Sequence, residues 1–595
     1  MKIRFKIGMA LLCFFLIQST KTNAQTFNSN LATMLQDSLT GMVAMFTNTQ
    51  GITASVYIPG QGLWEGAAGN SYPGQPLTTD MVVGLASNSK LYTAVMMLKL
   101  QENGIFDLDD PISNWLAPIP NVNPAITIRQ LLNHKSGISD PFFSTALLDT
   151  INAHPTQVYT PAMVFAWLGA PTCAPGTCYQ YSNINYILAG MIAQNATGIP
   201  IAQLIRDSIL NPLGLDSTFY DVEEPITGNI AHRWEGGIDL NSISRVSLNT
   251  AGGPAGSMFA TAGEVAQWYH ALMSGQVINQ NSYNEMITFS PLGNYGLGIQ
   301  SASILGHTYW GHSGGTVGYR SKVMYDECMG TTVVGIANNS EAAEQGITAL
   351  LFRIVWDNVP SCPGSIIGTN SVCPGETGIT YSVPSVLHAT SYVWTLPSGV
   401  IGFSNTNSIT VDFSMSAVSG NISVCGNSNF GVGPAVTFPV VVNTVPTGIT
   451  ITGDSLIIAD SSANSYQWIN CNTNNPIAGE TGQIFEPTVP GNYAVILTRG
   501  TCVDTSACSA INFSGTESYD AENISIYPNP SNGMIKLNTG NFEIEKLEVI
   551  NQLGQVVYQT TISPNEINLS SQVKGTYYFK LYSDHQVIAR KVIIQ

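Results

Sequence analysis

Two different hydrophobic patterns divide the chain near Pro360. Between about residues 28 and 358, helical and strand patterns are mixed, and apolar residues recur at helical spacing in Lys90–Gln101, which Gly104 ends, and in Ile347–Val355. After Pro360 the pattern changes to short alternating strands that are separated by Gly, Pro, Ser and Asn. We therefore predict one large α/β unit followed by small β-sandwiches.

The β-rich part contains a weak internal repeat and a linker. Ser-Tyr-X-Trp occurs at Ser391–Trp394 and again at Ser465–Trp468, each time in an aromatic strand pattern. A later stretch rich in Ser, Gly and Glu separates a last β-rich segment from these two. The predicted boundaries are 25–359 for the large α/β unit, 360–443 and 444–513 for two β-sandwiches, 514–523 for the linker and 524–595 for the last segment.

Residues 1–24 have the pattern of a cleaved secretory signal. Lys2, Arg4 and Lys6 precede an apolar run that ends near Ile17, and the small residue Ala24 follows a polar stretch. An N-terminal membrane anchor is the alternative, but the run is shorter than the roughly 20 residues that a spanning helix needs. No later segment is apolar enough to span a membrane, so we predict an exported protein.

The composition agrees with export. Charged residues make up 10% of the chain, against a typical ~25%, while Gly, Ser, Thr and Asn are abundant. The signal segment holds four basic and no acidic residues, so the remaining chain carries 17 basic against 38 acidic residues, a formal charge of −21. This acidity argues against nucleic acid as a partner and is interpreted as solubility outside the cell.

The cysteines predict disulfides and no metal site. Of the ten, Cys13 lies in the signal, and export permits the other nine to form disulfides. Cys173 and Cys178 bracket a turn-prone Ala-Pro-Gly-Thr and are expected to bridge locally. The odd number leaves at least one free thiol, which we expect at Cys328. Neither CxxC nor HExxH occurs, so no zinc site and no cofactor are predicted.

A serine and a lysine open the first long helical pattern. Ser87 and Lys90 are spaced i and i+3, so both side chains share one helix face. A hydroxyl at a helix N-terminus sits in positive field, and a desolvated ammonium beside it can exchange its proton. Taken alone, this spacing is also typical of a helix cap with a surface lysine. We interpret Ser87 as a candidate nucleophile and Lys90 as its proton-transfer partner.

Tyr181 and Asn183 form a second candidate group just before another helical pattern. A phenol relays protons if cations lower its pKa, and a carboxamide binds a substrate carbonyl and the lysine. A tyrosine packed in the core with an asparagine that caps the helix is the alternative.

Trp310–Thr316 supplies the third group, between two strand-like segments. Its glycines let backbone N–H groups approach a ligand, so Gly315 is a candidate oxyanion donor, and His312 is a candidate cleft residue or a structural histidine. Gly311–Gly315 also matches the G-x-S-x-G elbow, which would make Ser313 the nucleophile. That elbow must lead into a helix, whereas strand patterns follow here.

These three groups, in this order, resemble the serine beta-lactamase and penicillin-binding family, in particular its class C-like branch of DD-peptidases, esterases and related hydrolases. The resemblance covers about residues 40–358 and extends to Ile126–Ile138, Pro212–Thr218 and Tyr295–Ile299. It implies an α/β (α+β) beta-lactamase/transpeptidase-like domain with an antiparallel sheet and a helical subdomain, followed by three small all-β sandwich domains.

The resemblance also implies a role for each motif residue. Ser87 would be acylated, with Lys90 as its partner and Tyr181 as a shared general base or acid. The other implied roles are an oxyanion hole from the N–H groups of Ser87 and Gly315, orientation of substrate and lysine by Asn183, and a place in the substrate cleft for His312. Class C lactamases usually carry Lys-Thr-Gly where this chain has His312-Ser313-Gly314, a pattern more familiar from peptidases and esterases.

The C-terminal segments resemble two further families. Residues 367–442 resemble PKD-like or immunoglobulin-like repeats of exported bacterial proteins, and 444–513 are similar to them. Ile526–Gly533, Leu553–Val557 and Gly575–Tyr578 resemble the sorting domain of the type IX secretion system. This implies the secretion machinery as a partner, removal of the domain, and then release or attachment at the cell surface, for example to a surface glycan or lipopolysaccharide.

We therefore predict a secreted or cell-surface serine hydrolase that acts through an acyl-enzyme on amide or ester bonds. A D-amino-acid peptide or a small ester is a better substrate prediction than a beta-lactam antibiotic. The alternative is a surface binding or adhesion protein with a catalytically idle hydrolase domain, which would bind its partner through the β modules.

Overall fold

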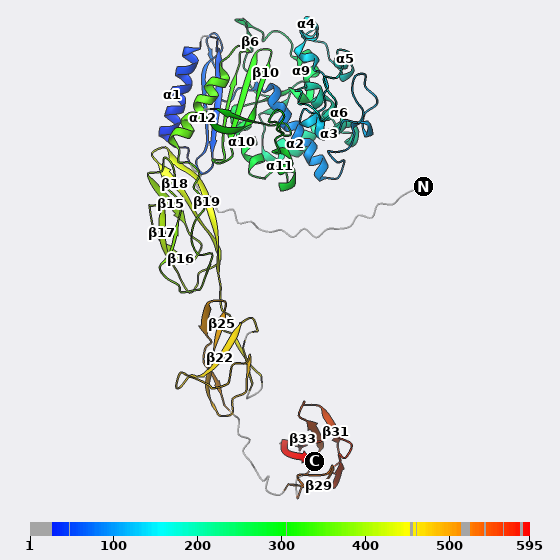
Figure 1. Cartoon of the computed structure of the whole chain (residues 1–595), viewed down its shortest axis with the longest axis vertical. Helices are drawn as coiled ribbons and strands as arrows, with labels where there is room; N and C mark the ends of the chain where they lie inside the picture. The colour runs from blue at the N-terminus through cyan, green and yellow to red at the C-terminus, as the bar shows by residue number, and fades with distance from the viewer. Residues whose placement is uncertain are drawn as a thin grey trace, which may run out of the picture. The chain divides into compact units, whose positions relative to one another are not determined.

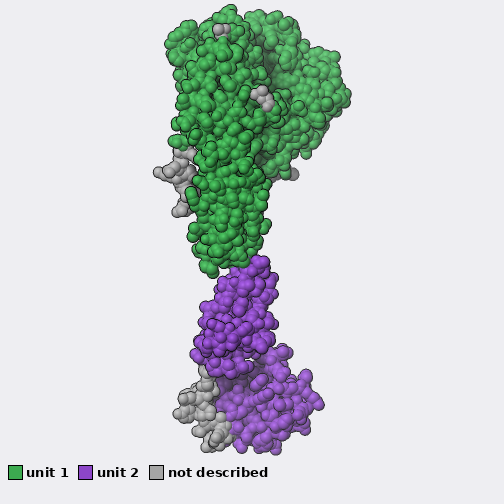
Figure 2. Space-filling model, turned by 60° about the vertical axis from the view of Figure 1, so that its left-hand side comes forward, with its two compact units in different colours: residues 1–444 green, residues 445–595 purple. Residues whose placement is uncertain are grey.

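The computed structural model describes residues 26–46, 48–304, 306–452, 456–459, 461–512, 524–540, 543–562, 564–583 and 587–595. The chain divides into two compact units, 1–444 and 445–595 (Figure 2). The predicted signal (1–24) and linker (514–523) lie outside the described residues. Among the helices that are described, none is long and apolar enough to cross a membrane.

A seven-stranded antiparallel sheet forms the centre of the N-terminal domain. Its first and last parts come together because β1 pairs with β12. Both faces of β1 are covered, so almost all of its residues are buried. The strands in sheet order are β3 (Gln75–Pro76), β2 (Gly62–Tyr72), β1 (Gly51–Ile58), β12 (Thr331–Ala337), β11 (Tyr319–Asp326), β10 (His307–Thr316) and β9 (Gln300–Ile304).

Helices cover the two faces of this sheet (Figure 1). On one face α1 (Ser29–Met45) and α12 (Glu344–Asn358) pack against alternate residues of β1 such as Ile52 and Val56. The other face of β1 contacts α10 (Ala262–Met273), where the Tyr57 ring stacks on the His270 ring with centroids 4.0 Å apart. The sheet is therefore a middle layer between helices.

The helical part of the domain packs around α2 (Ser89–Glu102). Eleven of the fourteen residues of α2 are buried, so this helix runs through the interior. The predicted helices Lys90–Gln101 and Ile347–Val355 are confirmed as parts of α2 and α12, and Gly104 follows α2 with a left-handed φ of 69°. The other α-helices are α3 (Ile128–Leu132), α4 (Thr145–Ala153), α5 (Pro161–Phe165), α6 (Asn183–Thr197), α7 (Ile201–Ile205), α8 (Asn211–Leu213), α9 (Val246–Gly252) and α11 (Gln280–Met286).

A β-sandwich follows α12 in the same unit. Its core holds Tyr381, Phe413 and Ile422, all nearly fully buried between two sheets. One sheet has the order β13 (Ser371–Val372), β19 (Gly431–Val442), β18 (Gly420–Ser428), β15 (Ser391–Thr395), and the other β14 (Ile379–Ser382), β17 (Ser408–Phe413), β16 (Val400–Gly402).

This sandwich is fastened to the N-terminal domain by the turn between β18 and β19. Gln61 Nε2 donates hydrogen bonds to the carbonyl oxygens of Phe430 and Val432, at 3.1 and 2.8 Å. The Phe430 side chain packs against the core beneath α1 and α12. A disulfide joins Cys328 to Cys362. The two domains therefore share a boundary with both apolar and covalent links.

That disulfide corrects one prediction. Cys328 was expected to be free, but it lies in the turn after β11 and meets Cys362, which follows α12. Among the cysteines that the structure describes, the free thiol is that of Cys425 on β18. The local Cys173–Cys178 bridge is confirmed.

The second unit contains two β-rich parts, each with two sheets. In the first, the repeat residue Trp468 is fully buried on β22, whereas Trp394 of the earlier sandwich is only half-buried on β15. Its strands are β20 (Ile449–Thr452), β21 (Leu456–Ala459), β24 (Ile484–Phe485), β23 (Asn475–Pro476), β22 (Ser465–Asn470), β25 (Gly491–Arg499), β26 (Cys502–Thr505) and β27 (Ser509–Ile511).

The last part has its own apolar core around Leu547, Val549 and Phe579. One sheet has the order β28 (Ser525–Tyr527), β29 (Met534–Asn538), β32 (Glu566–Asn568), and the other β31 (Val556–Thr560), β30 (Lys546–Asn551), β33 (Gly575–Tyr582), β34 (Val587–Ile594).

Candidate active site

Ser87 lies in a 3₁₀ turn, Ala86–Asn88, that leads directly into α2. Ala86 has a φ of 49°, in the left-handed region that a residue with a side chain rarely adopts. Neighbouring contacts hold this turn, because Asn88 Nδ2 donates to Ser321 Oγ at 2.7 Å and that hydroxyl donates to the Leu85 carbonyl at 2.6 Å. The strained turn presents Ser87 to a cleft.

Lys90 lies beneath Ser87 and is fully buried. Its Nζ lies 3.1 Å from Ser87 Oγ, 2.7 Å from Asn183 Oδ1 and 2.8 Å from the Ala255 carbonyl oxygen. Burial lowers the pKa of Lys90 to about 7, although the Asp140 carboxylate opposes this shift. Near neutral pH, Lys90 is therefore a neutral amine in a large fraction of the molecules.

Asp140 is a site residue that the sequence analysis missed. Its Oδ2 accepts hydrogen bonds from both the backbone N–H and the Nδ2 of Asn183, each at 2.8 Å. Because Nδ2 faces the carboxylate, Oδ1 of Asn183 faces Lys90. Burial raises the pKa of Asp140, while the hydrogen bonds from Asn183 and the charge of Lys90 lower it. Asp140 thus fixes the amide orientation that Lys90 requires.

Tyr181 comes from the segment just before α6 (Asn183–Thr197). Lys90 Nζ lies 4.9 Å from the centre of its ring. Burial raises the pKa of Tyr181 far above its usual range, despite the nearby Ser87 hydroxyl, which lowers it. The Tyr181 hydroxyl forms no hydrogen bond of normal geometry with Ser87 or with any other described residue. Tyr181 is therefore a protonated phenol that is free to donate.

Both ring nitrogens of His312 form hydrogen bonds. Nδ1 lies 2.6 Å from the Ser313 carbonyl oxygen, an acceptor, so Nδ1 carries the proton. Nε2 lies 2.9 Å from the Tyr295 hydroxyl and accepts its proton. Burial, together with the charge of Lys90, lowers the pKa of His312 to about 3. His312 is thus a neutral side chain whose hydrogen bonds are made within the protein.

Gly315 lies on β10 beyond the residues that pair with β9. That pairing covers His307–Gly311, so residues 312–316 form an open strand edge. Gly314 approaches the Ser87 turn so closely that a Cβ there would lie 2.2 Å from the Leu85 carbonyl oxygen. Glycine therefore lets this strand reach the turn that carries Ser87.

Ser313 does not occupy a nucleophile elbow. It lies within β10, and the chain continues through a turn into β11, with no helix directly after it. A nucleophile elbow requires a turn from a strand into a helix, and the segments on either side of Ser313 form no such turn. The elbow alternative is therefore wrong.

One cleft of about 570 Å³ contains the predicted groups. The structure brings Ser87, Tyr181, Asn183, His312 and Gly315 to its walls, and Lys90 contacts two of them from beneath. Tyr295 and the Ala255 carbonyl also contact these groups and were not predicted. Tyr295 belongs to one of the stretches that resemble the family, so this resemblance could have identified it as a site residue.

His134 supports the Tyr181 segment from behind. It is fully buried, and its Nδ1 accepts a hydrogen bond from the Ser182 N–H at 3.2 Å. Its ring lies 4.2 Å from the ring of Tyr181. Burial and the charge of Lys90 keep the pKa of His134 well below its usual value. A neutral His134 therefore packs without adding a charge beside Lys90.

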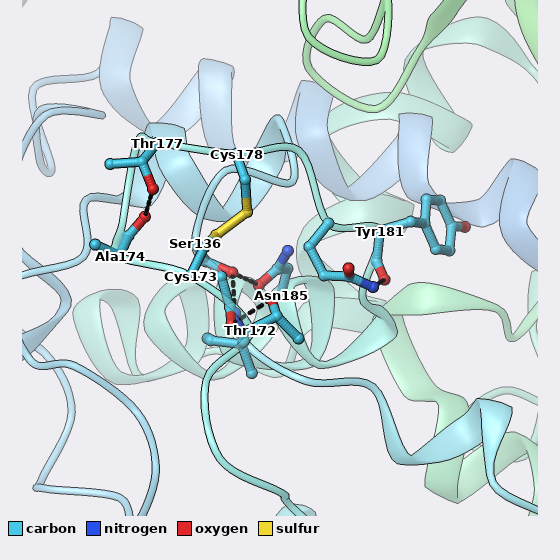
Figure 3. Close-up of a disulfide and its surroundings, with 11 residues drawn as sticks. Ser136, Thr172, Cys173, Ala174, Thr177, Cys178, Tyr181 and Asn185 are labelled. Atoms are coloured by element: carbon cyan, nitrogen blue, oxygen red, sulfur yellow. Dashed lines mark hydrogen bonds between the residues drawn. A yellow bond between two sulfur atoms is a disulfide. The ribbon is translucent and has the colours of Figure 1, made fainter.

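The Cys173–Cys178 disulfide closes the loop just before Tyr181. Figure 3 shows this bridge, the hydrogen bond from Thr177 to Ala174 across its loop, and Tyr181 further along the chain. Thr172 N–H and Gly176 N–H donate to the carbonyls of Gly137 and Lys135. The bridged loop is thereby tied to the segment that leads to Asp140.

Comparison with known proteins identifies the domain that carries this site. The beta-lactamase family model matches residues 37–353, more than half of the chain. The chain belongs to the beta-lactamase family. Its N-terminal domain is of the beta-lactamase and penicillin-binding-protein type. A PKD-like domain matches residues 359–440, and a secretion system C-terminal sorting domain matches 525–595. The sorting-domain match indicates a protein that is secreted or placed at the cell surface.

Relatives of the beta-lactamase domain are similar over part of their length. A penicillin-binding protein of Bacillus subtilis (strain 168) is 33% identical over 147 residues, 24% of this chain and 32% of the relative. The D-alanyl-D-alanine-carboxypeptidase/endopeptidase AmpH of Escherichia coli (strain K12) is 28% identical over 211 residues, 34% of this chain and 52% of the relative. The chain thus spans about a third to a half of these relatives.

Among solved structures, a D-stereospecific amidohydrolase from Streptomyces sp. matches with a TM-score of 0.48 and 27% identity. The match covers 53% of this chain and 97% of that structure.

Proposed function

We propose that Ser87 is the nucleophile of an acyl-enzyme mechanism in which Lys90 is the general base. The observation that carries this proposal is the set of partners around Lys90 Nζ. A neutral amine has two N–H donors and one lone pair. The carbonyl oxygens of Asn183 and Ala255 accept the two N–H groups, so the lone pair is left for the Ser87 hydroxyl at 3.1 Å.

The reaction then proceeds in two steps. Lys90 takes the Ser87 proton as Oγ bonds to the substrate carbonyl carbon, and the N–H groups of Ser87 and Gly315 stabilise the oxyanion. As the bond to the leaving group breaks, Tyr181 donates its proton to that group and recovers one from Lys90. In the second step, water attacks the acyl ester and the same groups transfer the protons in the reverse direction. This step restores Ser87.

A labelling experiment tests the nucleophile. A fluorescent fluorophosphonate or penicillin is expected to label the wild type and not Ser87→Ala. Ser313→Ala is the matched control, because it removes a hydroxyl from the same cleft and is expected to be labelled like the wild type. Equal labelling of Ser87→Ala and wild type would contradict the proposal. No labelling and no hydrolysis of any substrate, with binding by the β modules, would favour the binding-protein alternative.

We further propose that the substrate is a D-amino-acid peptide or a small ester. Two observations support this choice. His312 is neutral at the position where class C lactamases usually carry a carboxylate-binding lysine, and the Escherichia coli relative is named a D-alanyl-D-alanine carboxypeptidase/endopeptidase. In a panel of D-Ala-D-Ala peptides, p-nitrophenyl esters and nitrocefin, we expect the lowest kcat/KM for nitrocefin. A nitrocefin kcat/KM above those of the peptides and esters would overturn this choice.

We also propose that the sorting domain is removed after export and that the protein is then released or attached to a surface glycan or lipopolysaccharide. The match of residues 525–595 supports this. Mass spectrometry of the exported protein is expected to find no peptides from 524–595. An intact C-terminus on the mature surface protein would contradict removal.

A further inference from the structure

A second pocket of about 220 Å³ adjoins the catalytic cleft. The two hollows share Glu235, Leu248 and Val317 in their walls. Residues of α4, of α9 and of the β6 segment line the second pocket, and these elements lie at the top of the domain in Figure 1. Neither Ser87 nor Tyr181 lines it, so the proposed acyl transfer makes no use of this pocket.

A short hairpin sends two charged side chains to the second pocket. It consists of β6 (Trp234–Glu235) and β7 (Ile238–Asp239), and Arg233 directly precedes β6. Because side chains alternate along an extended strand, Arg233 and Glu235 share one face of the hairpin, and both line the pocket. Trp234 takes the other face, where its Nε1 donates to the Ser71 carbonyl oxygen at 2.8 Å.

The Arg233 guanidinium is buried and held in place, but one of its donor groups is left over. The residue is 4% exposed. Its Nε donates to the Leu240 carbonyl oxygen at 3.2 Å, and its Nη2 donates to the carbonyl oxygens of Ile243 and Ser244 at 2.6 and 3.3 Å. Nη1 donates to no residue that the structure describes. This nitrogen is therefore available to a ligand in the pocket.

The charge of Arg233 also lacks a direct partner. Asp221 and Glu235 interact with it electrostatically, but within the described part of the chain neither forms an ion pair with it. Asp221 pairs with Arg245 at 2.9 Å, and Glu235 Oε1 accepts a hydrogen bond from Ser340 Oγ at 3.0 Å. Burial lowers the pKa of Arg233, as expected for a cation whose charge is incompletely compensated. An anion in the pocket would supply the missing partner.

The second pocket lies on the acyl side of the proposed reaction. Tyr181, the proposed proton donor to the leaving group, lies beside His312, with ring centroids 6.0 Å apart. Val317 directly follows the other end of β10, beyond the proposed oxyanion donor Gly315. The leaving group therefore occupies the His312 end of this strand, and the acyl group extends toward Val317. Two residues of a strand span about 7 Å, which sets the distance from the scissile carbonyl to the pocket.

We propose that this pocket binds a carboxylate at the far end of the substrate's acyl group, through Arg233 Nη1 and the side-chain amide of Asn152. Asn152 lines the pocket from α4, and its side chain forms no hydrogen bond with any described residue. The inference rests on the proposed acyl-enzyme function, to which it adds an acyl-side specificity site. Glu235 opposes the anion, but it is exposed and its charge is screened by solvent, whereas the buried guanidinium acts through a lower dielectric.

A pair of substrates that differ in one charge tests the proposal. N-glutaryl-D-alanine p-nitroanilide ends its acyl group in a carboxylate, and the N-glutaramoyl compound ends it in a neutral amide. For the full exported protein, kcat/KM should be about tenfold or more higher for the glutaryl compound, the effect of a charge-assisted hydrogen bond. Equal values for the two compounds, or a higher value for the glutaramoyl compound, would overturn the proposal.

Variants on two elements locate the effect in the pocket. Asn152→Asp adds a carboxylate without a change to the hydrogen bonds of Arg233, so the ratio of the two kcat/KM values should fall by about tenfold. Arg233→Gln should bring the ratio to about one. If Arg233→Gln does not fold, Asn152→Asp decides the question alone. A ratio that Asn152→Asp leaves at the wild-type value would overturn the proposal.

A matched control removes a cation elsewhere in the domain. Arg353→Gln breaks an exposed ion pair with Asp357 on α12, so the ratio should stay at the wild-type value. If Arg233→Gln folds and loses equal kcat/KM for both compounds, Arg233 only holds the loop after β7, and the proposal fails.

A binding measurement separates this inference from the proposed function. Calorimetry compares the affinity of both compounds for Ser87→Ala and for Ser87→Ala with Asn152→Asp. If the wild type hydrolyses neither compound but Ser87→Ala binds the glutaryl compound about tenfold more tightly and the second change removes that difference, the pocket binds the anion and the catalytic proposal fails. If Ser87 is labelled and Ser87→Ala binds both compounds equally, the catalytic proposal stands and the pocket inference fails.

Discussion

The beta-lactamase domain and the β modules bury different kinds of side chain. In the beta-lactamase domain Lys90 and His134 are fully buried and His312 is 5% exposed, next to residues with strained backbone. In the modules after residue 360, the buried polar side chains among the described residues are those of Ser506 and Ser531. Burial of a polar group is costly unless it is satisfied. The beta-lactamase domain accepts that cost at the candidate site and also elsewhere, for example at Arg233 and Glu344, whereas the module interiors are almost entirely apolar.

The largest expected effect comes from removal of the buried amine. Lys90→Met keeps the length of the side chain but supplies no base to Ser87, so kcat/KM should fall by about 10³-fold or more. Steady-state kinetics on the best substrate of the panel measure this, and circular dichroism shows whether the fold persists. A variant that folds and keeps more than a tenth of the wild-type kcat/KM would remove Lys90 from the proton transfer.

The pH dependence follows from the lowered pKa of Lys90. In the proposed mechanism the neutral amine of Lys90 is the base, and it predominates above a pKa of about 7. The kcat/KM should therefore rise about tenfold per pH unit up to roughly pH 7 and level off above it. The same shift makes the folded state relatively more stable as the pH rises from about 7 toward 10.5, since the unfolded chain keeps its proton there. A flat profile between pH 5 and 8 would show that Lys90 carries no catalytic proton.

A smaller effect is expected from Asp140, which acts through Asn183. Asp140→Asn leaves one side-chain oxygen for three N–H donors, two from Asn183 and one from Phe142, so the Asn183 amide is less firmly oriented and kcat should fall by about 10- to 50-fold. The negative charge of Asp140 raises the pKa of Lys90, so its removal should also move the kcat/KM profile to lower pH. A loss of activity without that displacement would assign Asp140 a purely structural role.

The smallest effect on catalysis is expected from a change in a module core. Phe413→Ala removes a ring that is 1% exposed and should destabilise its sandwich by about 3–5 kcal/mol, seen as an earlier thermal transition. The kcat should stay within about twofold at temperatures below that transition. Phe403→Ala is the matched control, because that ring is 91% exposed in the same module. A large fall in kcat for Phe413→Ala alone would show that the sandwich shapes the catalytic site.

The motif residues of the site were predictable because each lies in a local pattern. Ser87 and Lys90 are one helical turn apart, and Gly315 lies in a glycine-rich strand, so short-range spacing carries their geometry. Asp140 was missed because its partner Asn183 lies 43 positions away. The local pattern at Asp140 is that of a helix cap, since its Oδ1 accepts a hydrogen bond from the Phe142 N–H. Nothing in that pattern indicates the contact of Asp140 with Asn183.

The same distinction holds for the fold. Long periodic segments predicted α2 and α12 within a few residues. The pairing of β1 with β12 joins strands almost 280 residues apart, and hydrophobic periodicity carries no information on such pairings. The Cys328–Cys362 bridge depends on the same long-range arrangement, which is why the free thiol was assigned to the wrong cysteine.

Cys425 is an unpaired thiol in a protein whose other cysteines mature in an oxidising environment. Disulfide exchange is initiated by a thiolate, and a single extra thiolate can attack a correct bridge. The Cys425 side chain is half-buried on β18, and burial raises its pKa. Its thiol therefore remains protonated and a poor nucleophile, so the odd cysteine does not scramble the bridges that hold the loop before Tyr181 and the junction after α12.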